Sequence, residues 1–142
     1  MIGGLAVNHW AEEPMATADV DIVIAADRIE EAVETLKILG FSEKRFQWSI
    51  NFKGESKVFI QISTEEMYLD FPKNAVPANV HGILMRVASL EDTLAGKLAA
   101  YREPQRRPTK RLKDILDIGR LVEAHPALLA KLPSDIVAKL DP

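Results

Sequence analysis

Residues 20–25 form a short, β-branched apolar segment, with Asp19 directly before it and Asp21 inside it. A run of this kind is typical of a strand buried in a sheet, where carboxylates are costly. Because side chains alternate along a strand, Asp19 and Asp21 share one face, with Cα atoms about 6.5–7 Å apart. The two carboxylates repel each other unless a cation neutralises them, and oxygen ligands suit a hard divalent ion. The pair therefore predicts a metal site; the alternative is two acids that face solvent at a strand end.

A pair of glycines, Gly3 and Gly4, comes shortly before this strand and opens a helical segment through residue 10. Glycine lets backbone N–H groups approach a phosphate closely, and the N-terminus of a helix attracts anions. A glycine pair by itself is equally typical of a plain turn. Its position before the two aspartates favours a phosphate-binding loop beside a magnesium site.

The pattern of the first 88 residues predicts a mixed sheet with helices. Apolar residues recur at helical spacing over residues 27–39, and Asp27 and Glu30 form the expected capping pair at the start of this helix. The expected strands are residues 46–52, 57–63 and 80–87, with a hairpin over 53–56 and a loop over 74–79. In the second of these strands, Gln61 lies on the face opposite to the apolar residues.

The remaining residues, 89–142, are predicted to be helical. Ser89 and Asp92 form a capping pair for a helix through about residue 100, and a second amphipathic helix starts at Thr109. Short helical pieces follow Pro126 and Pro133. With 142 residues, no repeat and no linker, we expect a single domain of the α/β (α+β) class, in which a mixed sheet is flanked by helices.

Charge is distributed unevenly along the chain. The net charge is −3, with 18 Lys+Arg and 21 Asp+Glu, which argues against an indiscriminate nucleic-acid binder. Residues 97–120, however, contain eight basic and three acidic residues. This segment predicts either a site for a phosphate-bearing ligand or a solvated helix face.

Composition excludes several other classes of site. The chain has no cysteine, which rules out thiol catalysis, disulfide bonds and cysteine-bound zinc. The histidines lack metal-ligand spacing, so we expect no zinc. No stretch reaches the ~18 apolar residues of a membrane span, and the first residues do not form a secretion signal. We therefore expect a cytoplasmic protein with no membrane contact.

Several motifs together resemble those of a known superfamily. The N-terminal ones are Gly3-Gly4, Asn8-His9-Trp10 and Thr17-Ala18-Asp19-Val20-Asp21-Ile22. They resemble the glycine-pair and Asp-x-Asp motifs of the DNA polymerase β-like nucleotidyltransferase superfamily, and more closely its small bacterial members related to abortive-infection (AbiEii-type) toxins. The helical motifs that support this similarity are residues 87–92, Gly96-Lys97, Arg106-Arg107-Pro108 and residues 113–118. The resemblance covers residues 3–124.

The resemblance implies a nucleotidyltransferase-like sheet on which Asp19 and Asp21 are catalytic and hold Mg²⁺. The residues implied to bind a nucleoside triphosphate are Gly3, Gly4, His9, Thr17, Lys97 and Arg107. The implied reaction transfers a nucleoside monophosphate to a hydroxyl on an RNA, a protein or a small molecule and releases pyrophosphate. The implied partners are a tRNA or protein acceptor and an antitoxin.

The chain departs from the family pattern at the third acid. Active members have a carboxylate on the neighbouring strand, facing the first two, whereas this chain has Gln61. An amide can orient a hydroxyl but does not take its proton. Asp70 is the candidate replacement if its loop folds back, and otherwise an ordinary loop acid. The alternative function is therefore a catalytically reduced protein that binds a nucleotide or a protein partner.

Two further expectations concern the basic segment and the start of the chain. Lys113 is a candidate to neutralise phosphate charge, but its spacing to Asp117 is also that of a surface ion pair, which we favour. Family members carry a helix and most of a strand before the glycine pair, and this chain has two residues there. A sheet without that strand would expose an edge, so we expect a homodimer that covers it.

Overall fold

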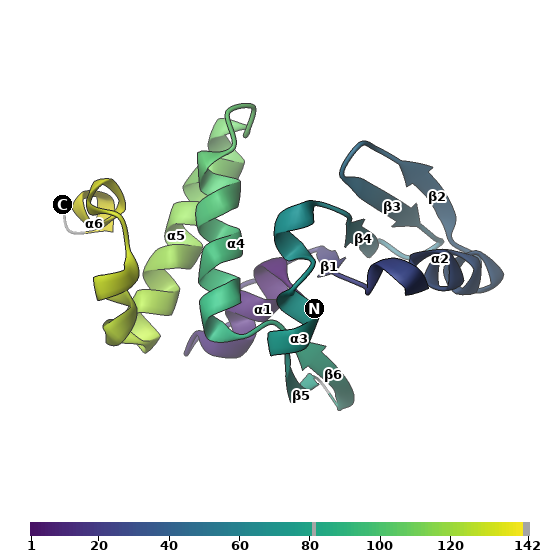
Figure 1. Cartoon of the computed structure of the whole chain (residues 1–142), viewed down its shortest axis with the longest axis horizontal. Coiled ribbons are helices and arrows are strands. Elements are labelled where there is room, and N and C mark those ends of the chain that lie inside the picture. Colours follow the sequence, from purple (N-terminus) through teal and green to yellow (C-terminus); the bar gives the residue numbers. More distant parts are fainter. Residues whose placement is uncertain (81, 141–142) are drawn as a thin grey trace.

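The computed structural model describes residues 1–80 and 82–140, and it has a sheet half and a helical half (Figure 1). The sheet half contains a four-stranded sheet with the strand order β1-β4-β3-β2. Its strands are β1 (Asp19–Ile22), β4 (Phe59–Ser63), β3 (Ser49–Lys53) and β2 (Ser42–Arg45). The pair β1 and β4 is parallel and the other two pairs are antiparallel, so the sheet is mixed, as the sequence predicted.

One face of this sheet is covered by α2 (Ile29–Ile38), which follows the short helix η1 (Ala26–Arg28). Val33 of α2 packs on Ile50, Phe52 and Ile62 of the central strands, and all four side chains are buried. Because side chains alternate along a strand, the neighbours of these apolar residues lie on the other face. That second face carries both aspartates of β1 and is not covered by α2.

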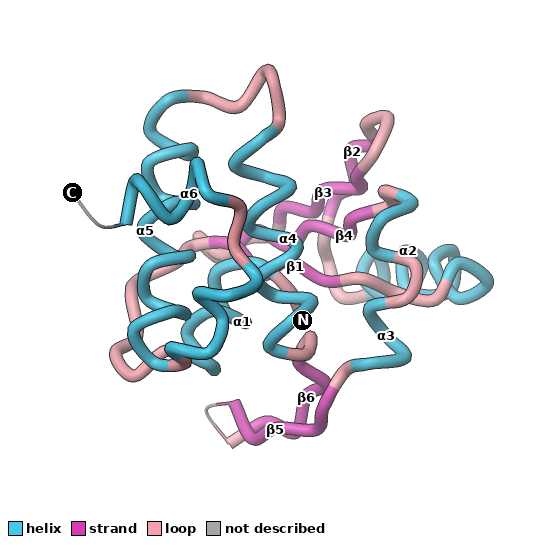
Figure 2. Tube along the Cα trace, turned by 60° about the vertical axis from the view of Figure 1, so that its left-hand side comes forward, coloured by secondary structure: helices cyan, strands magenta, loops and turns pink. Residues whose placement is uncertain are grey.

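The first residues of the chain connect this sheet to a second one. The hairpin of β5 (Val76–Val80) and β6 (Ile83–Val87) stands apart from the four-stranded sheet (Figure 2). Met1 donates its amino group to the carbonyl of Arg86 at 2.8 Å, and Ile2 donates its amide to the carbonyl of Asp21 at 2.8 Å. Helix α1 (Gly3–Trp10) therefore starts directly beside β1.

The helical half contains α4 (Leu90–Arg102), α5 (Pro108–Ala124), η3 (Pro126–Lys131) and α6 (Ser134–Leu140). The Ser89 hydroxyl caps α4 by accepting the Asp92 amide at 3.1 Å, as the sequence predicted. Val7 of α1 packs with Leu94, Ile118 and Leu121 in the core between these helices. Two short pieces, η2 (Glu66–Tyr68) and α3 (Phe71–Asn74), lead from β4 to β5. None of the helices described is long and apolar enough to cross a membrane.

Three expectations about local structure are wrong. Residues 74–79 are not a loop, because β5 occupies most of them, and its Pro77 is tolerated in a two-stranded hairpin. The sequence pattern missed β2, whose four residues are all polar because it is an edge strand. Asp27 and Glu30 form no cap; the Glu30 carboxylate pairs with Arg45 at 2.8 Å instead. Residue 81, inside the expected strand 80–87, lies outside the described residues.

Candidate functional site

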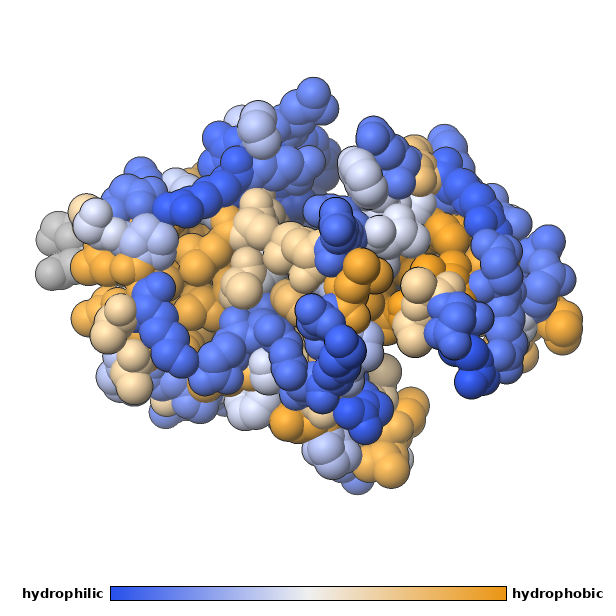
Figure 3. Space-filling model, viewed as in Figure 1, coloured by the Kyte–Doolittle hydropathy of each residue, from blue (hydrophilic) through white to orange (hydrophobic). Residues whose placement is uncertain are grey.

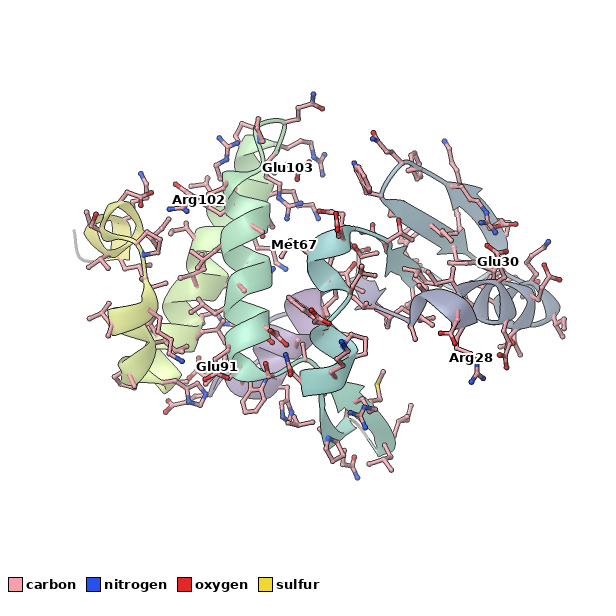
Figure 4. The ribbon with its side chains drawn as sticks, in the orientation of Figure 1. Arg28, Glu30, Met67, Glu91, Arg102 and Glu103 are labelled. Atoms are coloured by element: carbon pink, nitrogen blue, oxygen red, sulfur yellow. The ribbon has the colours of Figure 1, made fainter. Side chains whose placement is uncertain are left out.

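A cleft of about 630 Å³ separates the aspartate-bearing face of the sheet from α4 and the start of α5. Met67 on η2 and Glu103 at the end of α4 mark its two sides (Figure 4). Its polar and charged lining comes from β1, from β4 with the segment after it, and from α4 with the start of α5: Asp19, Asp21, Gln61, Ser63, Glu65, Tyr68, Asp92, Thr93, Lys97, Glu103, Gln105, Arg106, Arg107 and Lys110. The cleft therefore combines a row of carboxylates on the sheet with a row of cations on the helices.

Asp19 and Asp21 both line the cleft, because they lie two residues apart on β1. Within the described part of the chain neither carboxylate forms a hydrogen bond or an ion pair. Burial raises the pKa of Asp21, and the neighbouring charge of Asp19 raises it further, while Lys97, Lys110 and Lys113 act in the opposite direction. Two adjacent carboxylates without partners are an arrangement that a bound cation would stabilise.

Gly3 sits against the Asp21 carboxylate with φ of +67°, a conformation that favours glycine. A Cβ atom at this position would overlap the Asp21 side chain. At Gly4, a Cβ atom would lie 3.2 Å from the Thr17 hydroxyl and 3.3 Å from Lys113 Nζ. The glycine pair therefore brings the backbone at the start of α1 close to Asp21, Thr17 and Lys113.

The cations of α4 and α5 surround two buried acids. Asp114 and Asp117 on α5 are 1% and 0% exposed. Lys97 Nζ lies 2.8 Å from Asp117 and 3.4 Å from Asp114, and Arg106 binds Asp114 through two hydrogen bonds of 2.8 and 3.0 Å. Arg120 completes the network with a contact of 3.0 Å to Asp117. This network fixes Lys97 and Arg106 at the helical wall of the cleft.

The structure corrects the expectation that Lys113 and Asp117 form a surface ion pair. Lys113 Nζ is 3.9 Å from Asp117, but the Asp117 carboxylate is fully buried and shared with Lys97 and Arg120. The basic segment is likewise not a solvated face throughout, since Lys97 is 8% exposed. Its Arg107 and Lys110 are free to face the cleft.

Gln61 stands beside Asp21, at the place where the family resemblance implied a third acid. Gln61 is in register with Asp21 on the neighbouring strand and lines the cleft. Asp70 does not fold back into the cleft: its carboxylate is 75% exposed and pairs with Lys73 at 2.7 Å. Asp70 is therefore an ordinary surface acid in this structure.

Sequence analysis missed Glu65, which lines the cleft two residues beyond Ser63 on the same side of the chain as Gln61. Burial raises the pKa of Glu65, and the charge of Glu103 across the cleft adds to this effect. Burial, with the charges of Glu65 and Asp21, raises the pKa of Tyr68 to about 12, so this phenol keeps its proton near neutral pH. Glu65 follows the end of β4 as the residue before η2, so strand alternation alone did not identify it.

The remaining predicted residues are divided between the cleft and its surroundings. Gly3, Lys97 and Arg107 line the cleft. Thr17 stands behind it, next to Gly4. His9 does not reach it, since its ring is exposed and stacks edge-on against Trp10, with 4.9 Å between ring centroids.

Comparison with protein families identifies the family to which the chain belongs. The family model described as nucleotidyl transferase AbiEii toxin, type IV toxin–antitoxin system, matches residues 3–141. The chain belongs to this family. The match spans the glycine pair, both aspartates and the whole helical half, so it covers both walls of the cleft. No curated protein matches the sequence.

Solved structures of nucleotidyltransferases share the fold of this AbiEii family member. The adenylyltransferase ANT(2")-Ia, bound to adenylyl-2"-tobramycin, has a TM-score of 0.62 at 16% identity, over 98% of this chain and 84% of that one. The lincosamide adenylyltransferase LnuA, bound to lincomycin, has a TM-score of 0.57 at 14% identity over 84% of both chains. A nucleotidyltransferase-like protein from Paracoccidioides brasiliensis has a TM-score of 0.54 at 20% identity, over 98% and 82%. The nucleotidyltransferase fold expected from the sequence is confirmed.

Proposed function

We propose that this protein binds a nucleoside triphosphate with Mg²⁺ in the cleft and transfers a nucleoside monophosphate to a hydroxyl on an RNA, a protein or a small molecule. The observation that carries this proposal is the pair of partnerless carboxylates, Asp19 and Asp21, directly beside Gly3 and opposite the cations of α4 and α5. Membership of a toxin family supports a role as the toxin of a pair with an antitoxin partner.

The residues of the cleft fit an Mg²⁺ ion that is shared with a bound triphosphate better than a metal ion whose ligands all come from the protein. The described residues contain no group of three or more His, Cys, Asp or Glu side chains that could hold a metal ion. Mg²⁺ is usually bound by one or two carboxylates, with phosphate oxygens and water as its remaining ligands. Asp19 and Asp21 supply the two carboxylates, and a bound Mg²⁺ would neutralise charge on the phosphates.

The opposite wall supplies positive charge for the phosphates. Arg107 and Lys110 line the cleft at the N-terminus of α5, and Lys97 is held in place by Asp114 and Asp117. Fixed cations and backbone N–H groups stabilise charge that develops on a leaving pyrophosphate without having to reorganise. Gly3 lets the backbone at the start of α1 lie against Asp21, at the edge of the cleft that would hold the triphosphate.

The transfer also needs a group that takes the proton of the attacking hydroxyl. As the acceptor oxygen bonds to the α-phosphorus, the bond to pyrophosphate breaks and the hydroxyl proton must leave. Gln61 cannot take this proton, and Tyr68 remains protonated. Among the carboxylates of the cleft, Asp92 accepts from Asn74 at 3.0 Å and Glu103 lies 3.9 Å from Arg106. Glu65 forms no ion pair with a described residue, and we assign it as the base.

We expect Glu65→Gln to lower the transfer rate about 10²–10⁴-fold without changing triphosphate affinity, because a general base contributes that much. In the native protein the rate should fall as the pH drops through the pKa of Glu65, which lies above the usual glutamate value of 4.5. This decrease of the transfer rate at low pH should be absent in the Glu65→Gln variant. Pyrophosphate release with glycerol as the hydroxyl donor, measured from pH 4 to 9, checks both effects.

Glu66→Gln is the matched control for this variant, since Glu66 is exposed on η2 and does not line the cleft. It should leave the rate and its pH profile unchanged. Equal rates for the native protein and Glu65→Gln would show that Glu65 is not the base.

The experiment that tests the proposed function is calorimetric titration of the native chain with non-hydrolysable analogues of the four nucleoside triphosphates, with and without Mg²⁺. We expect binding that requires Mg²⁺, because the cleft otherwise presents two carboxylates to the phosphates. Binding should be followed by incorporation of label from the preferred α-labelled triphosphate. Absence of binding to all four analogues would contradict the proposal.

Gln61 favours a second candidate, a catalytically reduced member of the family that keeps the cleft for binding. Gln61 and Asp21 are adjacent across the sheet, so the place of the family's third carboxylate holds no titratable group. Under this alternative the triphosphate analogue binds, yet the native protein releases no pyrophosphate.

A further inference from the structure

The two buried acids of α5 are surrounded by a larger number of cations. The cations in contact with Asp114 and Asp117 are Lys97, Arg106, Lys113 and Arg120. Lys97 and Arg120 have side chains only 10% and 11% exposed, whereas the turn that joins α4 to α5 lies on a hydrophilic surface (blue, at the top of Figure 3). Charges that water does not reach are screened little, so these cations compete for the two carboxylates.

Each of the two arginines neutralises one of the acids. Arg106 donates two hydrogen bonds to Asp114, at 2.8 and 3.0 Å. Arg120 donates a hydrogen bond to Oδ1 of Asp117 at 3.0 Å. Hydrogen bonds between a guanidinium and a carboxylate are strong because both partners are charged. The arginines are therefore the main counter-ions of the two acids.

Lys97 is held more loosely than the arginines. Its Nζ atom lies 3.4 Å from Asp114 Oδ1, which is a long hydrogen bond. It also lies 2.8 Å from Asp117 Oδ2, but this buried oxygen accepts no hydrogen bond from any described residue, so the contact is ionic only. Because Lys97 lines the cleft, the surplus positive charge of the network is on the lysine that faces the phosphate site.

Arg120 reaches Asp117 without lining the cleft. It borders a separate cavity of about 370 Å³ instead. Its Nη2 atom donates to Asn8 Oδ1 at 2.9 Å and to the carbonyl of Glu13. Asn8 in turn binds the backbone of Met15 through hydrogen bonds of 2.7 and 2.9 Å. The end of α1 and the segment after it therefore hold the guanidinium in place at Asp117.

We infer that Arg120 is a positioning residue that neutralises Asp117 so that Lys97 stays available to a phosphate of the triphosphate. Without Arg120, the Asp117 carboxylate would need another counter-ion, because an uncompensated charge is costly in the protein interior. Lys97 is the nearest remaining cation, at 2.8 Å against 3.9 Å for Lys113. It would be drawn toward α5 and away from the cleft. This inference rests on the proposed function, since it presupposes that the cleft binds a triphosphate.

The test is calorimetric titration of Arg120→Gln with the preferred triphosphate analogue and Mg²⁺. We expect the affinity to fall about tenfold, as for the loss of a hydrogen bond between charged partners. Arg120→Lys keeps a positive charge beside Asp117, although an ammonium cannot also span Asn8 and Glu13, and it should bind the analogue like the native protein. Native affinity in Arg120→Gln would overturn the inference.

Arg102→Gln is the matched control. Arg102 contacts Asp135 at 3.2 Å in the same half of the molecule, and its side chain is 53% exposed. This variant should bind the analogue like the native protein. Arg120→Gln should melt below the native protein, because it leaves Asp117 with fewer counter-charges. Titration below the melting transition of every variant excludes unfolding as the cause of a lower affinity.

A double variant, Arg120→Gln with Asp117→Asn, separates charge balance from a purely structural role. It removes the acid together with its counter-ion, so no uncompensated carboxylate draws Lys97 away from the cleft. We expect it to bind the analogue more tightly than Arg120→Gln and nearly as tightly as the native protein. A purely structural role predicts the opposite, since the second substitution weakens a further buried contact. An affinity no higher than that of Arg120→Gln would overturn the inference.

Acetylation of Lys97 by acetic anhydride, followed by mass spectrometry, gives a readout that needs no triphosphate. An ammonium held by a buried carboxylate keeps its proton and therefore reacts more slowly. Relative to the exposed Lys139, Lys97 should react more slowly in Arg120→Gln than in the native protein and should recover in the double variant. Equal reactivity in all three proteins would overturn the inference. Absence of triphosphate binding by the native protein would instead contradict the proposed function, whereas acetylation reports on the charge balance alone.

Discussion

Asp21→Asn should abolish Mg²⁺-dependent binding of the nucleoside triphosphate and, with it, nucleotidyl transfer. The substitution keeps the shape of the side chain but removes one of the two negative charges that the cleft offers to a divalent cation. We expect a loss of about 3 kcal/mol or more, which is a factor of about 100 or more. Calorimetric titration with the preferred analogue, with and without Mg²⁺, measures it directly.

The stability of the same variant separates loss of binding from loss of fold. In the free protein the pKa of Asp21 is raised by burial and by Asp19, which shows that the charged carboxylate is unfavourable there. Asp21→Asn should therefore melt at the native temperature or above it. Asp27→Asn, an exposed acid on η1 outside the cleft, is the matched control and should bind like the native protein. Native-like Mg²⁺-dependent binding by Asp21→Asn would show that the triphosphate is held elsewhere.

Asp117→Ala should cause the largest loss of stability. Asp117 is fully buried and contacts Lys97 at 2.8 Å, Arg120 at 3.0 Å and Lys113 at 3.9 Å. Its removal leaves Lys97 with Asp114 as its buried counter-charge, and it removes the ion pairs of Arg120 and Lys113 within the described residues. Breaking a buried pair in this way costs about 3–5 kcal/mol. That is a large share of the 5–15 kcal/mol by which a typical domain is stable. Denaturation with urea measures the change.

A surface pair in the same half of the molecule gives the control. Asp135 on α6 contacts Arg102 at 3.2 Å, with side chains 60% and 53% exposed. Asp135→Ala should cost no more than about 1 kcal/mol, because exposed ion pairs contribute little. If both variants lost the same small amount, the buried network would not be what holds α4 against α5.

Local rules were sufficient for the parts of the site that lie close together in the chain. Alternation along β1 placed Asp19 and Asp21 on one face, and the glycine pair shortly before that strand predicted a phosphate-binding loop beside it; in the structure Gly3 lies against Asp21. The capping pair of Ser89 and Asp92 likewise marked the start of α4. These features depend on backbone geometry and sequence spacing, which a single segment specifies by itself.

Which residues of distant strands become neighbours could be read only from the assembled sheet. That Gln61 stands beside Asp21 follows from the parallel pairing of β1 with β4. The sequence offered Asp70 as the replacement acid, and the structure directs it to Lys73 at the surface and puts Glu65 in the cleft. Glu65 and Asp70 both follow β4 within a few residues, so their spacing in the sequence does not show which of them lies in the cleft. The course of the chain through η2 determines that it is Glu65.

By itself, therefore, the sequence determined the aspartate pair, the glycine loop and the mixed sheet with its helical end, because periodicity and spacing encode them. Tertiary structure alone decided the burial of Asp117, which helical spacing had presented as a surface ion pair. Whether a charge on a helix faces water or other charges depends on what packs against it. Here α4 brings Lys97 from seventeen positions before Asp114, a contact that no local pattern contains.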